Sequence, residues 1–263
     1  MMEQNQNMMQ MPVLFVGHGS PQNITQSNPF TKELASLGKA ITPKAILMIS
    51  AHWMTEKMML QQASLQKPLY DFYGFPKELY EVEYLPSGWS DEQLSLLQQT
   101  KLSFDLIQDR ALDHGVWAVL MHMYPEANIP VVQLSMPSGL SFLEYFEIGQ
   151  RLQTLRQEGV LIVGSGNIVH NLGQIDWALD ADPKPWALEF DQEVKKTLQE
   201  NNFSRFLDPG FAKLESFRHA HPTTEHWIPL MYCLGANDEK DHISFHCEFF
   251  QNASISMRSV LFS

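Results

Sequence analysis

The stretch Val131–Val163, VVQLSMPSGLSFLEYFEIGQRLQTLRQEGVLIV, contains two short apolar runs with an amphipathic segment between them. The runs Val131–Leu134 and Val160–Val163 have the composition of strands that are covered on both faces. Between them, Ser141 is followed three residues later by a glutamate, which is a capping-box pattern, and apolar residues then recur at the period of a helix. We therefore predict a strand, a helix that ends at Gly159, and a second strand.

The same alternation extends toward both ends of the chain. Further candidate elements are two apolar runs, two helix starts and two partly alternating tail segments: Val13–Val16 and Ala45–Ser50; Asn28 and Ser90; His242–Phe249 and Ser254–Phe262. Strands that alternate with amphipathic helices are typical of α/β proteins with a parallel sheet, and the tail segments add edge or antiparallel strands. We predict an α/β fold with a central, mostly parallel mixed sheet flanked by helices.

Domain organisation follows from what the sequence lacks. There is no internal repeat, low-complexity tract or obvious linker, so a single domain over residues 11–263 is expected. Residues 1–10 are polar and are expected to be disordered or extended. The segment Leu65–Trp89 is dense in proline, glycine and aromatic residues, which indicates a long ordered loop with a short helix that walls or covers a site.

The composition excludes several classes of protein. Lysine and arginine number 18 against 30 aspartate and glutamate, a net charge of −12, so neither nucleic acid nor an anionic membrane surface is expected as a partner. Two cysteines are too few for a disulfide framework and favour a reducing compartment. The amino terminus lacks the features of a secretory or transit peptide, so we expect a cytoplasmic protein.

Three histidines follow predicted strands. His18 lies just after the first apolar run, His52 just after the second, and His170 a few residues after the fourth. Because open α/β sheets place their ligand crevice at the carboxyl ends of the strands, these side chains are expected to meet there. His114 and His226 stand at loop-to-helix junctions, which hold a side chain at a fixed angle. Several imidazoles around one point predict a divalent metal site with an open position for substrate.

The histidines also have alternative interpretations at this point. A single histidine beside a glycine is more often a surface or hydrogen-bonded residue than a ligand, although three at equivalent strand ends are harder to attribute to chance. An open histidine site can also hold zinc that activates water for hydrolysis. A non-catalytic protein that merely binds zinc is a third interpretation.

Five motifs in the same order over nearly the whole chain then suggest a family. They are Gly17-His18-Gly19-Ser20-Pro21 with Asn23, Ser50-Ala51-His52-Trp53, Asp113-His114-Gly115 with Trp117, Gly166-Asn167 with His170-Asn171, and Pro222-Thr223 with Glu225-His226 and Pro229-Leu230. In these motifs the chain resembles the bacterial 4,5-DOPA dioxygenase extradiol family. That family is a branch of the class III extradiol dioxygenases, related to the β subunit of protocatechuate 4,5-dioxygenase.

The resemblance implies roles for particular histidines. His18, His52 and His226 match metal ligands. His170 matches either a fourth ligand in a zinc-bound resting form or the acid–base residue beside the metal, and His114 matches a second catalytic histidine that meets substrate or oxygen. Related ring-cleaving enzymes use two histidines and one carboxylate, whereas here a histidine stands at the third position with Glu225 beside it. This departure tilts the isolated protein toward zinc.

The function implied is cleavage of a DOPA-like catechol at the 4,5 position, with insertion of both atoms of O2 to give a seco-DOPA product. One divalent metal per chain is expected, Fe(II) for ring cleavage and Zn(II) in the purified protein. The partners would be a small catechol and O2, and the protein a monomer or small homo-oligomer. Candidate substrate-pocket residues are Ser20, Trp53, Asn167, Tyr73 and His221.

Overall fold

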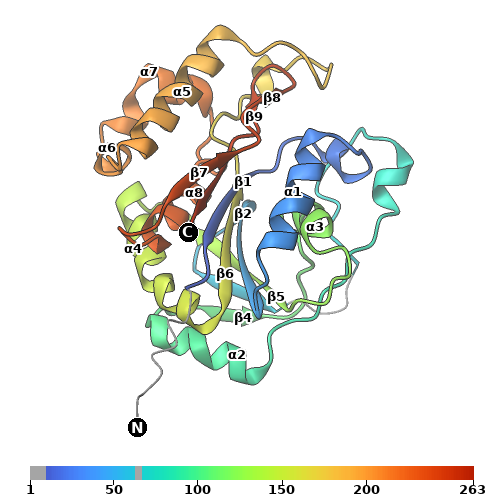
Figure 1. Cartoon of the computed structure of the whole chain (residues 1–263), viewed down its shortest axis with the longest axis vertical. Helices are drawn as coiled ribbons and strands as arrows, with labels where there is room; N and C mark the ends of the chain where they lie inside the picture. The colour runs from blue at the N-terminus through green and yellow to red at the C-terminus, as the bar shows by residue number, and fades with distance from the viewer. Residues whose placement is uncertain (1–9, 63–66) are drawn as a thin grey trace.

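A computed structural model describes residues 10–62 and 67–263, and it has an eight-stranded sheet at its centre (Figure 1). The predicted segment at residues 1–10 lies, apart from Gln10, outside the described residues. The order of strands across the sheet is β4-β3-β5-β2-β6-β1-β10-β7. The strands are β1 (Val13–Gly17), β2 (Ala45–Thr55), β3 (Met59–Gln62), β4 (Asp105–Ile107), β5 (Val131–Pro137), β6 (Val160–Gly166), β7 (Ile243–His246) and β10 (Ser259–Phe262).

The four strands predicted from apolar runs are the parallel centre of this sheet. β2 pairs in parallel with both β5 and β6, and β6 pairs in parallel with β1. Strand β10 is antiparallel to β1 and to β7, which confirms the antiparallel contribution expected from the tail. Two short strands, β8 (Phe250–Gln251) and β9 (Ile255–Ser256), pair with each other outside the main sheet. The mostly parallel mixed sheet is therefore confirmed.

Helices cover both faces of the sheet. In β1, Val13 and Phe15 pack into one hydrophobic cluster, whereas Leu14 and Val16 pack into another. Because successive side chains of a strand point to opposite faces, the two clusters are the two sides of the sheet. Helices α4 (Phe142–Leu152), α5 (Pro185–Gln199), α7 (Glu215–Ala220) and α8 (Ile228–Ala236) contribute to the first cluster, and α1 (Pro29–Ala40) and α3 (His114–Met123) to the second. The chain is a single α/β domain.

The predicted helix starts have the expected caps. Asn28, Ser90 and Ser141 each accept a hydrogen bond from a backbone N–H in the first turn of α1, α2 (Asp91–Leu96) and α4, and each completes a capping box. The segment after Ser141 departs from the prediction only at its end. The α-helix stops at Leu152 and continues as a 3-10 helix, which tightens the last turns before Gly159 adopts a left-handed φ of 89°.

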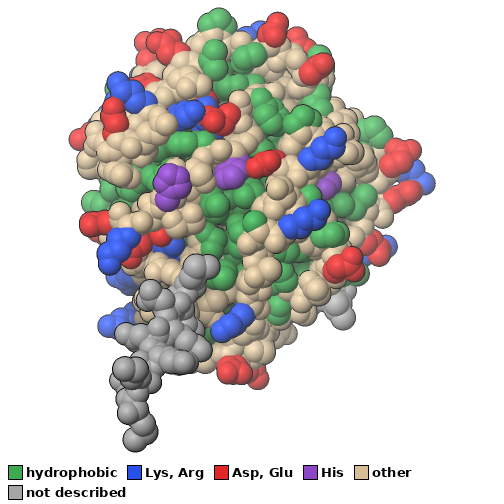
Figure 2. Space-filling model, in the orientation of Figure 1, with side chains coloured by type: hydrophobic (Ala, Val, Ile, Leu, Met, Phe, Trp, Pro, Cys, Tyr) green, Lys and Arg blue, Asp and Glu red, His purple; other side chains and the backbone are tan. Residues whose placement is uncertain are grey.

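The aromatic loop is ordered over Lys67–Trp89, the part that the structure describes, and contains the expected short helix at Lys77–Tyr80. It packs along α3, where Tyr70 and Phe72 lie against the ring of Trp117. The short helix α6 (Ser204–Leu207) lies beside α5 and α7 at the end of the molecule near β8 and β9 (Figure 1). Figure 2 shows acidic and basic side chains interspersed on the face it presents, with no continuous basic patch there. In the described part of the chain, the helices are too short or too polar for any to traverse a lipid bilayer.

Candidate functional site

Five histidines from five separate segments meet at the carboxyl edge of the parallel strands. His18 follows β1, His170 follows β6, and His52 lies near the end of β2. His114 is the first residue of α3, and His226 precedes α8 by two residues. Strands β2, β6 and β1 are neighbours in the sheet, so their carboxyl ends bring these residues into one place.

The structure corrects one local detail at His52. The sequence ends the strand at Ser50, whereas β2 continues to Thr55 because Met54 and Thr55 pair with Met136 and Pro137 of β5. The register shifts between Ile49 and Met54. An irregularity of this kind re-aims the side chains it carries, and His52 lies within it.

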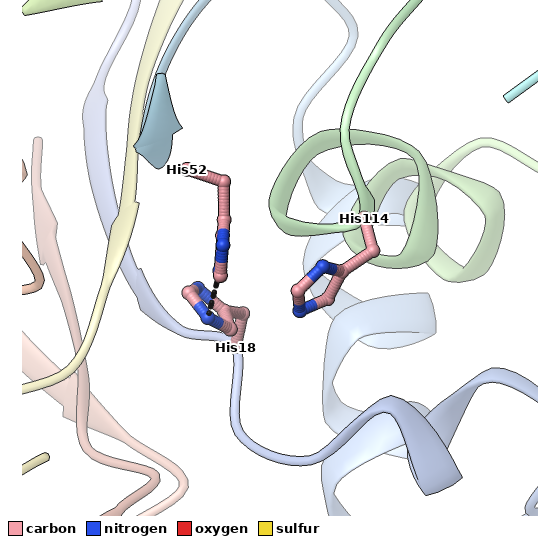
Figure 3. A group of neighbouring side chains, drawn as sticks. All are labelled: His18, His52 and His114. Atoms are coloured by element: carbon pink, nitrogen blue, oxygen red, sulfur yellow. Dashed lines mark hydrogen bonds between the residues drawn. The ribbon is translucent and has the colours of Figure 1, made fainter. Parts of the chain in front are cut away.

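The imidazoles are close enough to share one small ligand. Ring centroids of His18 and His52 are 5.0 Å apart, and that of His226 is 5.3 Å from His18 and 5.1 Å from His52. His114 is 4.1 Å from His52, and His170 stacks on His226 at 3.4 Å with an interplanar angle of 7°. Figure 3 shows the rings of His18, His52 and His114 turned toward a common space.

Burial keeps most of these rings neutral. Burial lowers the pKa of His18, His52 and His226 well below the ordinary value near 6.5, and repulsion among the histidines lowers it further. Burial and the neighbouring His114 likewise lower the pKa of His170 from its ordinary value near 6.5 to about 4. Neutral imidazoles present lone pairs, which is the form that binds a metal.

Two rings of the cluster share one carboxylate that the sequence analysis missed. Asp71 Oδ1 lies 2.8 Å from His114 Nδ1, and Asp71 Oδ2 lies 3.4 Å from His52 Nδ1. Burial opposes the ionisation of Asp71, but the hydrogen bonds from His114 outweigh it and lower the pKa of the carboxyl to about 2. The signal available in the sequence was an acidic residue between Tyr70 and Phe72 in the aromatic loop.

The remaining nitrogen atoms of the cluster are poorly satisfied by the protein. His18 Nδ1 lies 3.0 Å from Ser165 Oγ, but its Nε2 faces His52 Nε2 at 3.1 Å. Both ring nitrogens of His226 are buried with no hydrogen-bond partner among the described residues, and Glu225 Oε1 is 3.6 Å from its Nδ1. Buried polar atoms left in this state call for an unseen partner such as an ion.

The donor set therefore fits a divalent transition metal. Neutral imidazoles suit iron and zinc, and outer carboxylate or hydroxyl partners on Nδ1 are the usual supports of metal-binding histidines. Ligand atoms of His18, His52 and His114 all lie within 4.8 Å of one another. This group contains His114, to which the sequence gave a catalytic role, and omits His226, which the sequence placed among the ligands. Both remain within reach of the same space.

The candidate pocket residues are dispersed more widely. Asn167 and His221 are buried, and His221 Nε2 lies 2.8 Å from the carbonyl of Ile168. Trp53 is buried beneath the guanidinium of Arg110. Ser20 is partly buried and caps a 3-10 turn after His18, whereas Tyr73 is 92% exposed. Their roles toward a substrate stay predictions.

Comparison with known proteins independently supports the family resemblance. The family model described as "Catalytic LigB subunit of aromatic ring-opening dioxygenase" matches residues 11–262. The chain is 38% identical over 260 residues to a 4,5-DOPA dioxygenase extradiol of Escherichia coli (strain K12), covering 95% of this chain and 94% of that protein. It is also 38% identical over 234 residues to a 4,5-DOPA dioxygenase extradiol of Beta vulgaris, covering 86% of each.

A solved structure agrees with these matches. The crystal structure of an uncharacterized protein from Escherichia coli K12 superposes with a TM-score of 0.81 at 35% identity, covering 96% of this chain and 100% of the other. Fold, histidine cluster and sequence relatives all point the same way. The chain belongs to the family of the catalytic LigB subunit of aromatic ring-opening dioxygenases, and it is an extradiol ring-cleavage dioxygenase.

Proposed function

We propose that this protein cleaves a DOPA-like catechol at the 4,5 bond, using one divalent metal held by His18, His52 and His226. The observation that carries the proposal is the convergence of buried, neutral histidines, among which His226 has no hydrogen-bond partner for either ring nitrogen within the described residues. The names of the two relatives supply the substrate class. The carbon–carbon bond of the catechol ring next to the hydroxyl pair breaks. Both atoms of O2 enter the product, so no external reductant is required.

Iron(II) is the metal we propose for turnover. Bound among these imidazoles, it would supply a template and an electron path between the catechol and O2. Zn(II) suits the same nitrogen donors and is expected to occupy purified protein. Glu225, 3.6 Å from His226 Nδ1, is the nearest equivalent of the carboxylate found in related enzymes.

His170 and His114 are proposed to handle protons. A neutral His170, stacked on His226 at 3.4 Å, can accept a proton from a catechol hydroxyl. The negative charge left on the substrate would raise the affinity of the His170 imidazole for that proton. His114 donates its Nδ1 proton to Asp71, so its Nε2 is free to accept a hydrogen bond from substrate or oxygen species. Ser20, Trp53, Asn167, Tyr73 and His221 are the proposed pocket residues.

The test is reconstitution under anaerobic conditions with Fe(II), followed by L-DOPA and air. A yellow ring-opened product should form with uptake of one O2 per catechol. His246→Gln is a matched control, because His246 lies on β7 and its ring contacts Glu33 outside the cluster. No oxygen uptake with L-DOPA or any simple catechol would overturn the proposal. Activity with Zn(II) and without O2 would favour a hydrolase.

His170→Gln separates the two roles left open for that residue. An acid–base residue contributes about 100- to 10,000-fold to the rate, so turnover should fall by that factor while metal content stays at one per chain. If the variant instead purifies with little metal, His170 is a ligand. Metal analysis and oxygen uptake on the same preparation decide between them.

The cellular compartment and the oligomeric state of the protein are part of the same proposal. We expect the protein to work in the cytoplasm, as a monomer or a small homo-oligomer, with a small catechol and O2 as its partners. Both cysteines are free and buried. Light scattering of the purified chain measures the oligomeric state directly.

A further inference from the structure

Asp71 occupies a distinctive place in the aromatic loop. Its carboxylate contacts three groups: His114 Nδ1 at 2.8 Å, the backbone N–H of His114 at 3.0 Å, and His52 Nδ1 at 3.4 Å. Among the described residues it is the only carboxylate with an oxygen within 4 Å of a ring nitrogen of His52 or His114. We propose that Asp71 is a positioning residue: it fixes His52 and His114 so that their Nε2 atoms face the metal centre, and it ties that centre to the aromatic loop.

The first step of the argument concerns tautomers. A carboxylate only accepts hydrogen bonds, so the short contact requires the proton of neutral His114 to be on Nδ1. The Nε2 lone pair of His114 is then free to bind a ligand. The same carboxylate favours the proton of His52 on Nδ1, which frees the Nε2 that faces His18 at 3.1 Å. Outer partners of this kind orient a metal-binding imidazole and increase its basicity.

The second step concerns the start of α3. Asp113 is the N-cap residue of this helix, but its side chain makes no capping hydrogen bond. Its carboxylate instead accepts hydrogen bonds from Ser50 Oγ at 2.7 Å and Gln133 Nε2 at 2.5 Å, which ties the helix to β2 and β5. Asp71 therefore accepts the bond from the first helical N–H. Because a helix begins with unpaired N–H groups, this contact stabilises α3 and fixes its first residue, His114.

The third step concerns the loop that carries Asp71. Leu69 N donates to Leu112 O at 2.9 Å, and Trp117 Nε1 donates to Leu69 O at 3.1 Å. On the other side, the ring of Phe72 meets that of His114 edge to face at 5.5 Å. The carboxylate is thus held from both sides, and its side chain is only 20% exposed. A substitution at Asp71 should release the loop and the two imidazoles together.

The inference rests on the proposed metal-dependent function, so the test measures metal binding without substrate or O2. Apo protein is titrated with Co(II), and affinity is obtained from the visible absorption bands and from competition with a chelator. Losing an outer partner of a ligand lowers metal affinity about 10- to 100-fold, which is expected for Asp71→Ala. Asp71→Asn keeps an oxygen for His114 but loses the anionic contact with His52, so its affinity should lie between those of the wild type and the alanine variant.

A control and a second readout distinguish positioning from a general folding defect. Glu78→Gln changes an exposed carboxylate in the same loop and should bind Co(II) like the wild type. The Co(II) bands of Asp71→Ala should shift, because His52 changes orientation, while the far-UV circular dichroism of the apo protein stays as in the wild type. If Asp71→Ala does not fold, Asp71→Asn carries the comparison.

The outcomes separate the two proposals. If the wild type binds Co(II) and cleaves L-DOPA with iron, but Asp71→Ala matches it in affinity and spectrum, the inference about Asp71 is overturned and the proposed function stands. If the wild type takes up no Co(II), the metal centre itself is wrong, and the role of Asp71 falls with it.

Discussion

Two buried polar clusters in this molecule differ in how well the protein satisfies them. In the first, Arg258 Nε lies 3.1 Å from both carboxylate oxygens of Asp191, and Ser256 Oγ donates to the same carboxylate at 2.6 Å. Neither Asp191 nor Arg258 has a buried polar side-chain atom without a partner among the described residues. In the histidine cluster, both ring nitrogens of His226 have none. A satisfied cluster stabilises the fold, whereas an unsatisfied one is prepared for a ligand.

The largest expected effect is on the satisfied cluster. Asp191→Ala leaves the buried Arg258 guanidinium without its main counter-charge, so the free energy of unfolding should fall by about 3–5 kcal/mol. Urea denaturation measures this change. Metal affinity of the folded variant should remain that of the wild type. An equal loss of metal affinity would mean that the two clusters are not separate.

The converse substitution is His226→Phe, which keeps a flat ring against His170 and removes both nitrogens. Metal affinity should fall by more than about 100-fold, beyond the effect of an outer partner. The unfolding free energy of the apo protein should change by no more than about 1 kcal/mol, because no protein hydrogen bond is lost. Calorimetric titration with Zn(II) and urea denaturation test the two halves. Normal metal binding would remove His226 from the ligand set.

Metal removal should show in the wild type that the histidine cluster, unlike the Asp191–Arg258 cluster, needs a ligand to stabilise the fold. A ligand that binds only the folded state, at 100 times its dissociation constant, raises the free energy of unfolding by about 2.7 kcal/mol. We expect this stabilisation with Zn(II) and its loss on chelation. In Asp191→Ala, Zn(II) should raise the free energy of unfolding by the same amount, although the apo variant is less stable than the apo wild type. In His226→Phe, Zn(II) should raise it little. Denaturation with and without chelator gives all three values.

The smallest effect, over the range from pH 7 to pH 5, is the acid dependence of stability. His221 Nε2 donates to the carbonyl of Ile168, and its buried Nδ1 has no hydrogen-bond partner among the described residues, so burial lowers the pKa of His221 to about 3. The unfolded chain therefore binds a proton near pH 6.5 that the folded protein refuses until about pH 3. Stability should fall as pH drops through this window, by about 1.4 kcal/mol per pH unit for each such group.

His221→Gln isolates that contribution. In chelated protein, the unfolding free energy of the variant should depend less steeply on pH between 7 and 5 than that of the wild type, by up to about 1.4 kcal/mol per unit. Urea titrations at three pH values provide the slopes. Identical slopes would show that His221 is not a buried neutral group.

Much of the fold was predictable because its signals are local. Each central strand is a short apolar run, and each predicted helix start carries a capping residue. Strands β3 and β4 were not predicted. Asp105–Ile107 of β4 is three residues long and partly exposed, so it has no hydrophobic pattern of its own, and only pairing with β3 makes it a strand.

The candidate site was likewise predictable only as far as its signals are local. The sequence by itself determined which elements carry His18, His52, His114, His170 and His226, because strand ends and helix starts follow from residue order. Only the tertiary structure decided which nitrogen faces which neighbour. Asp71 reaches His114 across 43 positions of the chain, and that contact depends on how a loop packs on a helix. Local periodicity carries no information about contacts between distant segments, because these are fixed by the packing of the whole domain.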